Sequence, residues 1–393
     1  MTTIKIAQFV DTFYPKIDGV ARVVDNYAAN LNAYDDVDCC VFCPEVAKNY
    51  KDEMSYDVIR TKSLPLLSDY RLPAPKLSKA PAIAFKERKP DLVHAHSPFT
   101  LGHYGMSLAK QLGVPFVTTF HSKYYEDFLQ RSHSKFISKK LVNYIVRFYS
   151  QADSVWTVGE STAETLRSYG YKGEIVLMDN ATTMTYPEDP EECRRLLAEK
   201  YTIPKKGKNL LFVGRITNQK NLYFMLDTMR CIKDKEIKLI VVGDGAELKA
   251  LKQYAVKYGI ADRVVFVGQI SDQRVLKSFY LESDLFFFPS TYDTSTLVAR
   301  EAAALKVPTI MIRGCNSADL LIENQNGFLC DEVPESAAAT IEQIFASPET
   351  LNNVGKTALD TIGTSWKNRM PEVVEKYREI IEDYASKRKA GRS

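Results

Sequence analysis

Long apolar runs and tracts of biased composition are missing from this sequence. No stretch approaches the roughly 18 apolar residues that a membrane-spanning helix needs. The residues from Met1 to Gln8 lack the charged and apolar regions of a signal peptide, so we expect a cytoplasmic protein. With 393 residues, 45% of them hydrophobic and 26% charged, the composition is typical of an ordinary soluble protein of about two domains.

The chain also lacks the cysteine and histidine spacings of metal sites. Its seven cysteines are an odd number, and Cys39, Cys40 and Cys43 share one strand-like run, which favours reduced buried thiols over disulfides or zinc. Only five histidines occur. His94 and His96 alternate on a predicted strand and so face one side, but no third metal ligand is evident. We interpret His94 as structural and His96 as a cleft residue, and we expect no metal.

Short apolar runs alternate with helical patterns along the chain, which is typical of βαβ units around parallel sheets. The first half has these runs at 4–10, 37–43, 92–95, 115–119 and 154–158, and the second half at 210–213, 238–242, 264–267, 285–288 and 309–312. The polar stretch 178–190 is the predicted linker. The pattern predicts an α/β protein with two Rossmann-like domains that face a central cleft, where ligands usually bind.

A pair of cationic residues follows the first strand of the second half. Gly214 and Arg215 come directly after the run 209–213, and Lys220 precedes a helical stretch at 221–231. Ligands of open α/β sheets collect where strands end. Arginine offers a planar fork for phosphate oxygens, lysine a mobile charge, and the helix N-terminus adds N–H donors. The pattern favours a diphosphate site, and the alternative is two solvated cations at a loop.

Two acidic residues mark a later loop and helix. Asp293 follows the run 285–288 in a predicted turn, and Glu301 lies eight residues further on, within an alanine-rich helical stretch at 297–305. Carboxylates hydrogen-bond vicinal hydroxyls, so a nucleotide ribose and a sugar ring are natural targets. The alternative is a carboxylate that only complements the helix dipole.

Taken together, these stretches resemble the retaining family 4 glycosyltransferases, which have the GT-B fold. The matching stretches of the C-terminal half are 213–221, 242–245, 289–302 and 323–328. Those of the N-terminal half are 14–21, 93–102 and 119–127, and they look like the diacylglycerol glucosyltransferase (monoglucosyldiacylglycerol synthase) subgroup. The resemblance spans nearly the full chain.

This resemblance implies a domain plan and a set of site residues. Residues 1–180 would form an acceptor-binding, membrane-facing domain, 181–365 a nucleotide-sugar-binding domain, and 366–393 a helix that crosses back to the first. Asp293 and His121 would be the catalytic residues at the donor sugar, and Glu301 would hold the ribose. The implied donor-binding residues are Gly19, Arg215, Lys220, Gly243, Ser295, Thr296, Leu297 and Glu301.

Two positions depart from the family pattern. The family usually has Glu where this chain has Asp293, and the shorter side chain requires a closer backbone or weakens the contact with the donor sugar. Residues 294–296 replace a stretch that commonly contains glycine. Because a β-branched Thr296 avoids positive φ, either the loop differs or its geometry never needed glycine.

Positive charge is concentrated in one segment of the first half. Residues 60–150 contain 15 Lys and Arg against 5 Asp and Glu, in a chain whose net charge is +3. Within this segment, the apolar residues Phe136, Ile137, Leu141, Tyr144, Ile145 and Phe148 recur at helical spacing. The basic residues of the same stretch are Lys135, Lys139, Lys140 and Arg147.

Two interpretations of this basic amphipathic helix stay open. It either packs its apolar face into the core beneath a solvated basic face, or adsorbs to anionic lipid, where each basic residue contributes about 1 kcal/mol. The patch would be extended by Arg71, Lys76, Lys79, Lys86, Arg88 and Lys89, and by the apolar residues of 64–67 and 72–73. Nothing in the sequence resembles a base-reading module, so we expect no nucleic-acid partner.

The function implied by the resemblance is transfer of a hexose, with glucose the first expectation, from UDP-sugar to the hydroxyl of a membrane lipid such as 1,2-diacylglycerol. The anomeric configuration of the sugar would be retained, and the reaction would need no cofactor or metal. The enzyme would associate peripherally with the inner face of the cell membrane. Residues facing the acceptor or the membrane would be His96, Lys135, Lys139, Lys140 and Arg147.

Other functions remain compatible with the same donor residues. A glycosyltransferase with a soluble acceptor, such as a sugar, inositol or a cell-wall precursor, would differ only in the basic region. A non-catalytic nucleotide-sugar sensor would bind without turnover. An epimerase on the same fold would need an acid/base set that is not evident.

Overall fold

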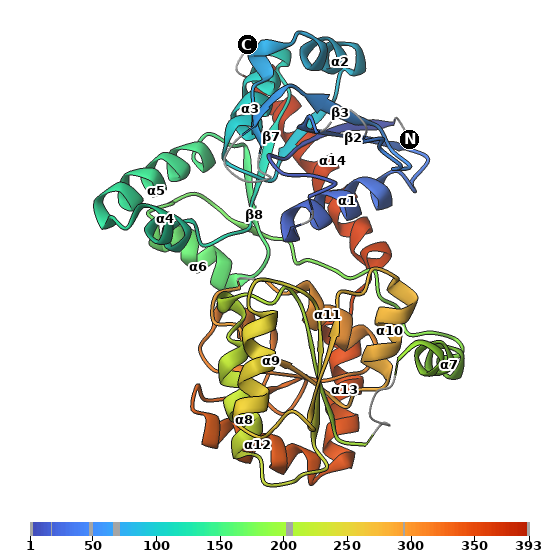
Figure 1. Cartoon of the computed structure of the whole chain (residues 1–393). Helices are drawn as coiled ribbons and strands as arrows, with labels where there is room; N and C mark the ends of the chain where they lie inside the picture. Colours follow the sequence, from blue (N-terminus) through green and yellow to red (C-terminus); the bar gives the residue numbers. More distant parts are fainter. Residues whose placement is uncertain are drawn as a thin grey trace. The chain divides into compact units, whose positions relative to one another are not determined.

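The structure is a computed structural model that describes residues 3–16, 18–46, 50–65, 71–201, 207–293 and 295–390. The chain forms two compact units (Figure 1). Unit 1 comprises Met1–Asn180 and Trp366–Ser393, and unit 2 comprises Ala181–Ser365.

Unit 1 is built on a parallel sheet in the order β3-β2-β1-β6-β7-β8-β9. Its strands are β1 (Ile4–Phe9), β2 (Val37–Pro44), β3 (Val58–Thr61), β6 (Leu92–Ala95), β7 (Phe116–Phe120), β8 (Ser154–Thr157) and β9 (Val176–Leu177). An antiparallel hairpin pairs β4 (Ser63–Pro65) with β5 (Arg71–Pro73). The helices are α1 (Gly19–Leu31), η1 (Pro75–Leu77), α2 (Ala80–Arg88), α3 (Thr100–Leu112), α4 (Tyr124–Ser132), α5 (Lys135–Tyr149), α6 (Glu160–Ser168) and α14 (Trp366–Ala390).

The core of unit 1 is rich in aromatic residues, and it includes the C-terminal helix. Phe9 of β1 stacks on Phe42 of β2 with 4.5 Å between ring centroids. Helix α14 packs on α1, where Trp366 contacts Tyr27 with 5.4 Å between their ring centroids. These contacts place the last helix in the same compact unit as the first strand, as its red colour among the blue elements of Figure 1 shows.

Unit 2 repeats the plan with a parallel sheet in the order β12-β11-β10-β13-β14-β15. Its strands are β10 (Asn209–Val213), β11 (Lys238–Val242), β12 (Val264–Gly268), β13 (Leu285–Phe288), β14 (Thr309–Ile312) and β15 (Phe328–Cys330). Its helices are α7 (Pro190–Lys200), η2 (Asn218–Lys220), α8 (Leu222–Cys231), α9 (Leu248–Lys257), α10 (Gln273–Leu281), α11 (Leu297–Ala304), η3 (Asn316–Leu320), α12 (Pro334–Phe345) and α13 (Pro348–Thr361). In Figure 1, α8, α9 and α12 cover one face of the sheet, and α11 and α13 the other.

Each apolar run predicted as a strand coincides with a strand of one of the two sheets, within a residue or so at its ends. Buried parallel strands are apolar almost throughout, which makes them visible in sequence. The short strands β3, β4, β5, β9 and β15 were not predicted.

Three cysteines lie together in β2 and are buried as free thiols. Burial raises the pKa of both Cys40 and Cys43 to about 12, so these thiols stay protonated and unreactive. Among the residues that the structure describes, no helix is both long and apolar enough to cross a membrane.

Candidate active site

The strand order of unit 2 reverses between β10 and β13, which are adjacent and parallel. Successive strands lie on one side from β10 to β12 and on the other from β13 to β15. Open α/β sheets bind ligands outside the carboxyl ends of the strands at such a switch point. The loops after Val213 and Phe288 therefore frame the candidate site of this unit.

The loop that bears Arg215 is tied to the loop after β11. The Gly214 N–H donates to the Val242 carbonyl at 3.0 Å, and the Ile216 N–H donates to the Asp244 carbonyl at 2.8 Å. A β-carbon on Gly243 would lie 1.9 Å from the Gly214 carbonyl oxygen, so only glycine permits this approach. Gly243, predicted as a donor-binding residue, thus has a packing role next to Arg215. Its contact with a donor stays a prediction.

Arg215 and Lys220 differ in their surroundings. The Arg215 side chain is exposed, and no partner of its guanidinium is found among the described residues. The Lys220 ammonium, by contrast, lies 2.7 Å from both carboxylate oxygens of Asp293, and its Nζ is 5.5 Å from the centre of the Phe288 ring. One cation of the predicted diphosphate site is therefore open to solvent, and the other is paired.

The Lys220–Asp293 ion pair is largely shielded from solvent. The side chains of Lys220 and Asp293 are only 16% and 23% exposed. Nearby, the Ser290 hydroxyl donates to the Gln219 carbonyl at 3.0 Å, so the loops after β10 and β13 are joined at two points. Phe288 and Ser290 were not singled out from the sequence, because an apolar strand end and a turn serine are common everywhere.

The loop before α11 does not need a left-handed residue at Thr296. Thr296 is the N-cap of α11 with φ −102° and ψ 115°, which is ordinary extended backbone. Thr296 therefore adopts backbone that any residue can take, which fits both alternatives posed by the sequence, and Thr294 lies outside the described residues. Ser295, Thr296 and Leu297 lie at the positive end of the α11 dipole, which favours an anionic ligand.

Glu301 lies one turn into α11 and is buried, with 6% of its surface exposed. Its Oε2 accepts a hydrogen bond of 2.9 Å from the hydroxyl of Tyr280 on α10. Tyr280 is fully buried, so it holds the carboxylate in one orientation. The sequence contained no signal for Tyr280, since a buried tyrosine in a helix is usually only part of the core.

The switch point of unit 1 lies between β1 and β6, and β7 pairs with β6 on its other side. Gly19 follows β1 as the first residue of α1, and the Asp18 side chain caps this helix by accepting from the Ala21 N–H at 2.8 Å. A β-carbon on Gly19 would meet no atom of the described residues within 4 Å. The contact of Gly19 with a donor phosphate stays a prediction.

His96 follows β6 and His121 follows β7, and the two rings meet. Nδ1 of His96 lies 3.2 Å from Nε2 of His121. The exposed fraction is 1% for His96 and 8% for His121. Burial lowers the pKa of His121 to about 3 and that of His96 well below its usual value, so both rings are neutral. His96 was predicted to face the acceptor or the membrane, and the structure places it in the interior beside His121.

His94 is held on both sides within unit 1. Its Nδ1 lies 2.6 Å from the Tyr377 hydroxyl of α14, and its Nε2 lies 2.7 Å from the Thr119 hydroxyl. The prediction that His94 is structural agrees with these contacts. No cluster of three or more metal-ligating side chains occurs in the described part of the chain.

Helix α5 buries one row of side chains, as the core-packing interpretation expects, and also exposes four large apolar side chains. Phe136 is 68% exposed, Tyr144 51%, Ile137 47% and Leu141 38%. The buried row consists instead of Ser138, Val142, Ile145, Phe148 and Tyr149. Lys135, Lys139, Lys140 and Arg147 are exposed on the same helix, and the Lys140 ammonium lies 4.5 Å from the centre of the Phe136 ring. We call this mixed basic and apolar region the α5 surface.

The predicted extension of the basic patch is partly engaged within the protein. Arg71 donates two hydrogen bonds to Ser63, and Arg88 pairs with Asp38 and Asp57. Leu64 and Leu72 of the β4–β5 hairpin are about half exposed, as predicted for an interfacial role, while Leu66 and Leu67 lie outside the described residues.

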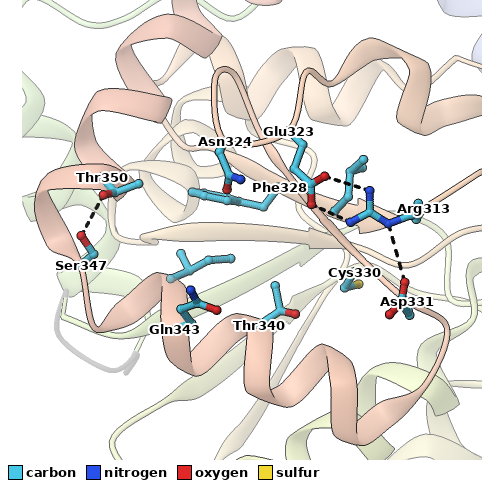
Figure 2. Close-up of a pocket in the computed structure, with 12 residues that line it drawn as sticks. Arg313, Glu323, Asn324, Phe328, Cys330, Asp331, Thr340, Gln343, Ser347 and Thr350 are labelled. Atoms are coloured by element: carbon cyan, nitrogen blue, oxygen red, sulfur yellow. Dashed lines mark hydrogen bonds and ion pairs between the residues drawn. The ribbon is translucent and has the colours of Figure 1, made fainter.

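A separate pocket of about 450 Å³ lies beside β15 in unit 2 (Figure 2). There the Arg313 guanidinium donates to both oxygens of Glu323 at 2.8 and 2.6 Å and lies 3.7 Å from Asp331. The hydrogen bonds from Arg313 lower the pKa of Glu323. The stretch 323–328, which matches a family motif, lies at this pocket and contains none of the predicted donor residues.

These two parallel-sheet α/β units have the architecture of the GT-B fold. A solved structure of sucrose-phosphate synthase from Thermosynechococcus elongatus is similar to the chain with a TM-score of 0.82 and 22% identity. The match covers 97% of this chain and 100% of that one.

Two glycosyltransferase families match the two halves of the sequence. Glycosyltransferase Family 4 matches residues 17–183, and Glycosyl transferases group 1 matches residues 194–361. The chain belongs to these glycosyltransferases, as the resemblance predicted.

Its curated relatives act on different substrates. The alpha-monoglucosyldiacylglycerol synthase of Streptococcus pneumoniae is 29% identical over 355 residues, which cover 88% of this chain and 79% of that protein. The GDP-mannose-dependent alpha-mannosyltransferase of Corynebacterium glutamicum is 23% identical over 394 residues, which cover 96% and 89% of the respective chains.

Proposed function

We propose that this glycosyltransferase is a retaining enzyme that moves glucose from UDP-glucose to the hydroxyl of a membrane lipid such as 1,2-diacylglycerol. The observation that supports the lipid acceptor is the α5 surface, where four apolar side chains are exposed among four basic ones. Soluble proteins seldom leave such side chains in water without a partner. The similarity to a monoglucosyldiacylglycerol synthase supports the same acceptor.

In this proposal, the loops of unit 2 bind the nucleotide sugar. Arg215 and Lys220 stabilise the charge that grows on the diphosphate as its bond to the sugar breaks, which is electrostatic catalysis. Glu301, oriented by Tyr280, accepts hydrogen bonds from the ribose hydroxyls, and Asp293 accepts them from the sugar. From unit 1, the family resemblance assigns His121 to the donor sugar and Gly19 to the donor phosphate. We assign no covalent nucleophile, cofactor or metal.

Adsorption of the α5 surface to a bilayer has a simple physical basis. Phe136, Ile137, Leu141 and Tyr144 would enter the headgroup region, and removing their apolar area from water contributes about 25 cal/mol per Å². The lysines and Arg147 would add about 1 kcal/mol each near anionic lipid. We propose that the enzyme works at the inner face of the cell membrane in this way.

A different donor and acceptor form the second candidate. The mannosyltransferase of Corynebacterium glutamicum is GDP-mannose-dependent and matches a larger share of this chain than the diacylglycerol enzyme does. The donor residues discussed above hold a diphosphate and hydroxyls, which all nucleotide sugars contain. The base and the sugar therefore have to be tested directly.

The deciding experiment measures nucleoside diphosphate release from UDP-glucose and from GDP-mannose, each with and without diacylglycerol in anionic liposomes. We expect release from UDP-glucose that requires diacylglycerol, and its loss in Lys220→Ala and Glu301→Ala. Release that requires only a soluble acceptor would refute the lipid proposal. Tight donor binding without release to any acceptor would instead indicate a sensor.

A matched pair of variants tests the α5 surface itself. Phe136→Ser with Lys140→Ser should weaken sedimentation with anionic liposomes at least tenfold, because it removes one apolar and one basic group from the interface. Val256→Ser with Lys249→Ser makes the same changes on the exposed face of α9 and serves as the control. Equal loss in both pairs would show that α5 has no special role.

A further inference from the structure

The Lys220–Asp293 ion pair places a carboxylate at the position where a diphosphate is proposed to bind. Both Asp293 oxygens lie 2.7 Å from the Lys220 ammonium, so the carboxylate pairs with this cation through both oxygens. The pair is mostly shielded from water, and Coulomb interactions are stronger in such surroundings than in bulk solvent. A diphosphate that uses Lys220 must therefore displace Asp293 or accept it as a neighbour.

The donor and the product of the reaction differ in how they meet this carboxylate. The nucleotide sugar brings hydroxyls next to its diphosphate, and hydroxyls donate hydrogen bonds to a displaced Asp293. The nucleoside diphosphate lacks these hydroxyls. Its terminal phosphate also carries roughly one more negative charge near neutral pH, because the second ionisation of a phosphate monoester lies near pH 6.

We propose that Asp293 acts as a discriminator between donor and product. When the sugar leaves, Asp293 loses its hydroxyl partners and competes with the terminal phosphate for Lys220. The product is thereby bound weakly and released, whereas the intact donor is not penalised. This inference rests on the proposed donor role of Lys220 and adds a means of limiting product inhibition at the same site.

The test compares the affinities of UDP and UDP-glucose by calorimetry in the wild type and in Asp293→Asn. The variant keeps the size of the side chain and removes its charge. We expect UDP to bind about tenfold more tightly to Asp293→Asn, while the affinity for UDP-glucose stays the same or falls. In an activity assay, inhibition by added UDP should become stronger by the same factor.

Two controls separate the ion pair from a general effect of charge. Glu332→Gln removes a carboxylate that bonds Asn221, directly after Lys220, but does not touch Lys220 itself, and it should change UDP affinity less than threefold. In a Lys220→Ala background, Asp293→Asn should no longer tighten UDP binding by more than about threefold, since the competition has been removed. Thermal melting of each variant verifies its fold.

The outcomes distinguish this inference from the proposed function. Unchanged or weaker UDP binding in a folded Asp293→Asn, or equal tightening of UDP and UDP-glucose, would overturn the discriminator role and leave the enzyme assignment intact. A wild type that binds neither UDP nor UDP-glucose would refute the UDP-sugar proposal, whatever the variants do. Tightening that persists in the Lys220→Ala background would show that Asp293 acts without Lys220 and would also overturn the inference.

Discussion

Nδ1 of His96 lies 3.2 Å from Nε2 of His121, and both rings are buried in unit 1. In a neutral pair, one of these nitrogens donates and the other accepts, so each ring restricts the tautomer of the other. His96 therefore lies buried beside His121, the histidine that is predicted to contact the donor sugar.

The histidine pair predicts that stability falls in mild acid. The pKa of folded His121 is about 3, below the roughly 6.5 of an unfolded histidine, so the unfolded state binds more protons as the pH falls below 6.5. Each such histidine lowers the free energy of unfolding by up to about 2 kcal/mol between pH 6.5 and 5. Urea unfolding of the wild type and of His121→Asn should show this difference in pH dependence.

Because other titrating groups are present in both His121→Asn and the wild type, their contributions cancel when the two proteins are compared. Asp11 of unit 1 has its pKa raised by burial to about 6 and acts in the opposite sense, but it is present in both proteins. His133→Asn at an exposed position is the control and should follow the wild type. An identical pH dependence in His121→Asn and the wild type would contradict the buried, neutral state of His121.

Tyr280→Phe should weaken donor binding while leaving the fold intact. The substitution removes only the hydroxyl that orients Glu301, which costs about 1 kcal/mol and corresponds to a three- to tenfold higher KM for the donor. Tyr254→Phe removes a comparable hydrogen bond of 2.7 Å to Asp227 elsewhere in unit 2 and should not change KM. Steady-state kinetics of both variants decide whether the Tyr280 hydroxyl serves the site.

Substitution by alanine is expected to destabilise the protein at Gly243 but not at Gly19. Gly243→Ala should destabilise unit 2 by about 2 kcal/mol or more, because its β-carbon would overlap the Gly214 carbonyl. Gly19→Ala should leave the melting temperature unchanged, since no atom in the described part of the chain lies within 4 Å of its β-carbon. If a phosphate approaches this backbone, Gly19→Ala still weakens donor binding about tenfold. Wild-type affinity in a folded Gly19→Ala would remove Gly19 from the donor site.

Chelation of divalent metals is expected to leave activity unchanged. In the proposal, Arg215 and Lys220 neutralise the diphosphate, which is the role that a metal plays in other transferases. Activity in excess EDTA should remain within about twofold of the untreated enzyme. A loss that added Mg²⁺ or Mn²⁺ restores would show that a metal completes the site.

The strands and the helix next to the loops of Arg215 and Asp293 could be predicted, because a short stretch of sequence is enough to identify each of them. The strands 209–213 and 285–288 are continuous apolar runs, and buried parallel strands require such runs wherever they occur. The helical stretch that follows Thr296 could also be predicted, because it is rich in alanine. Arg215, Lys220, Asp293 and Glu301 could therefore be placed at strand ends and a helix start without coordinates.

The amino-acid sequence by itself determined the two α/β units, the order of their strands along the chain and the family motifs. Only the tertiary structure decided which of these residues meet. Lys220 and Asp293 are 73 residues apart, and their pairing depends on β10 and β13 being neighbours in the sheet. It also decided that Phe136 and Tyr144 of α5 are exposed, because helical periodicity groups apolar residues on one side but burial depends on what packs against that side.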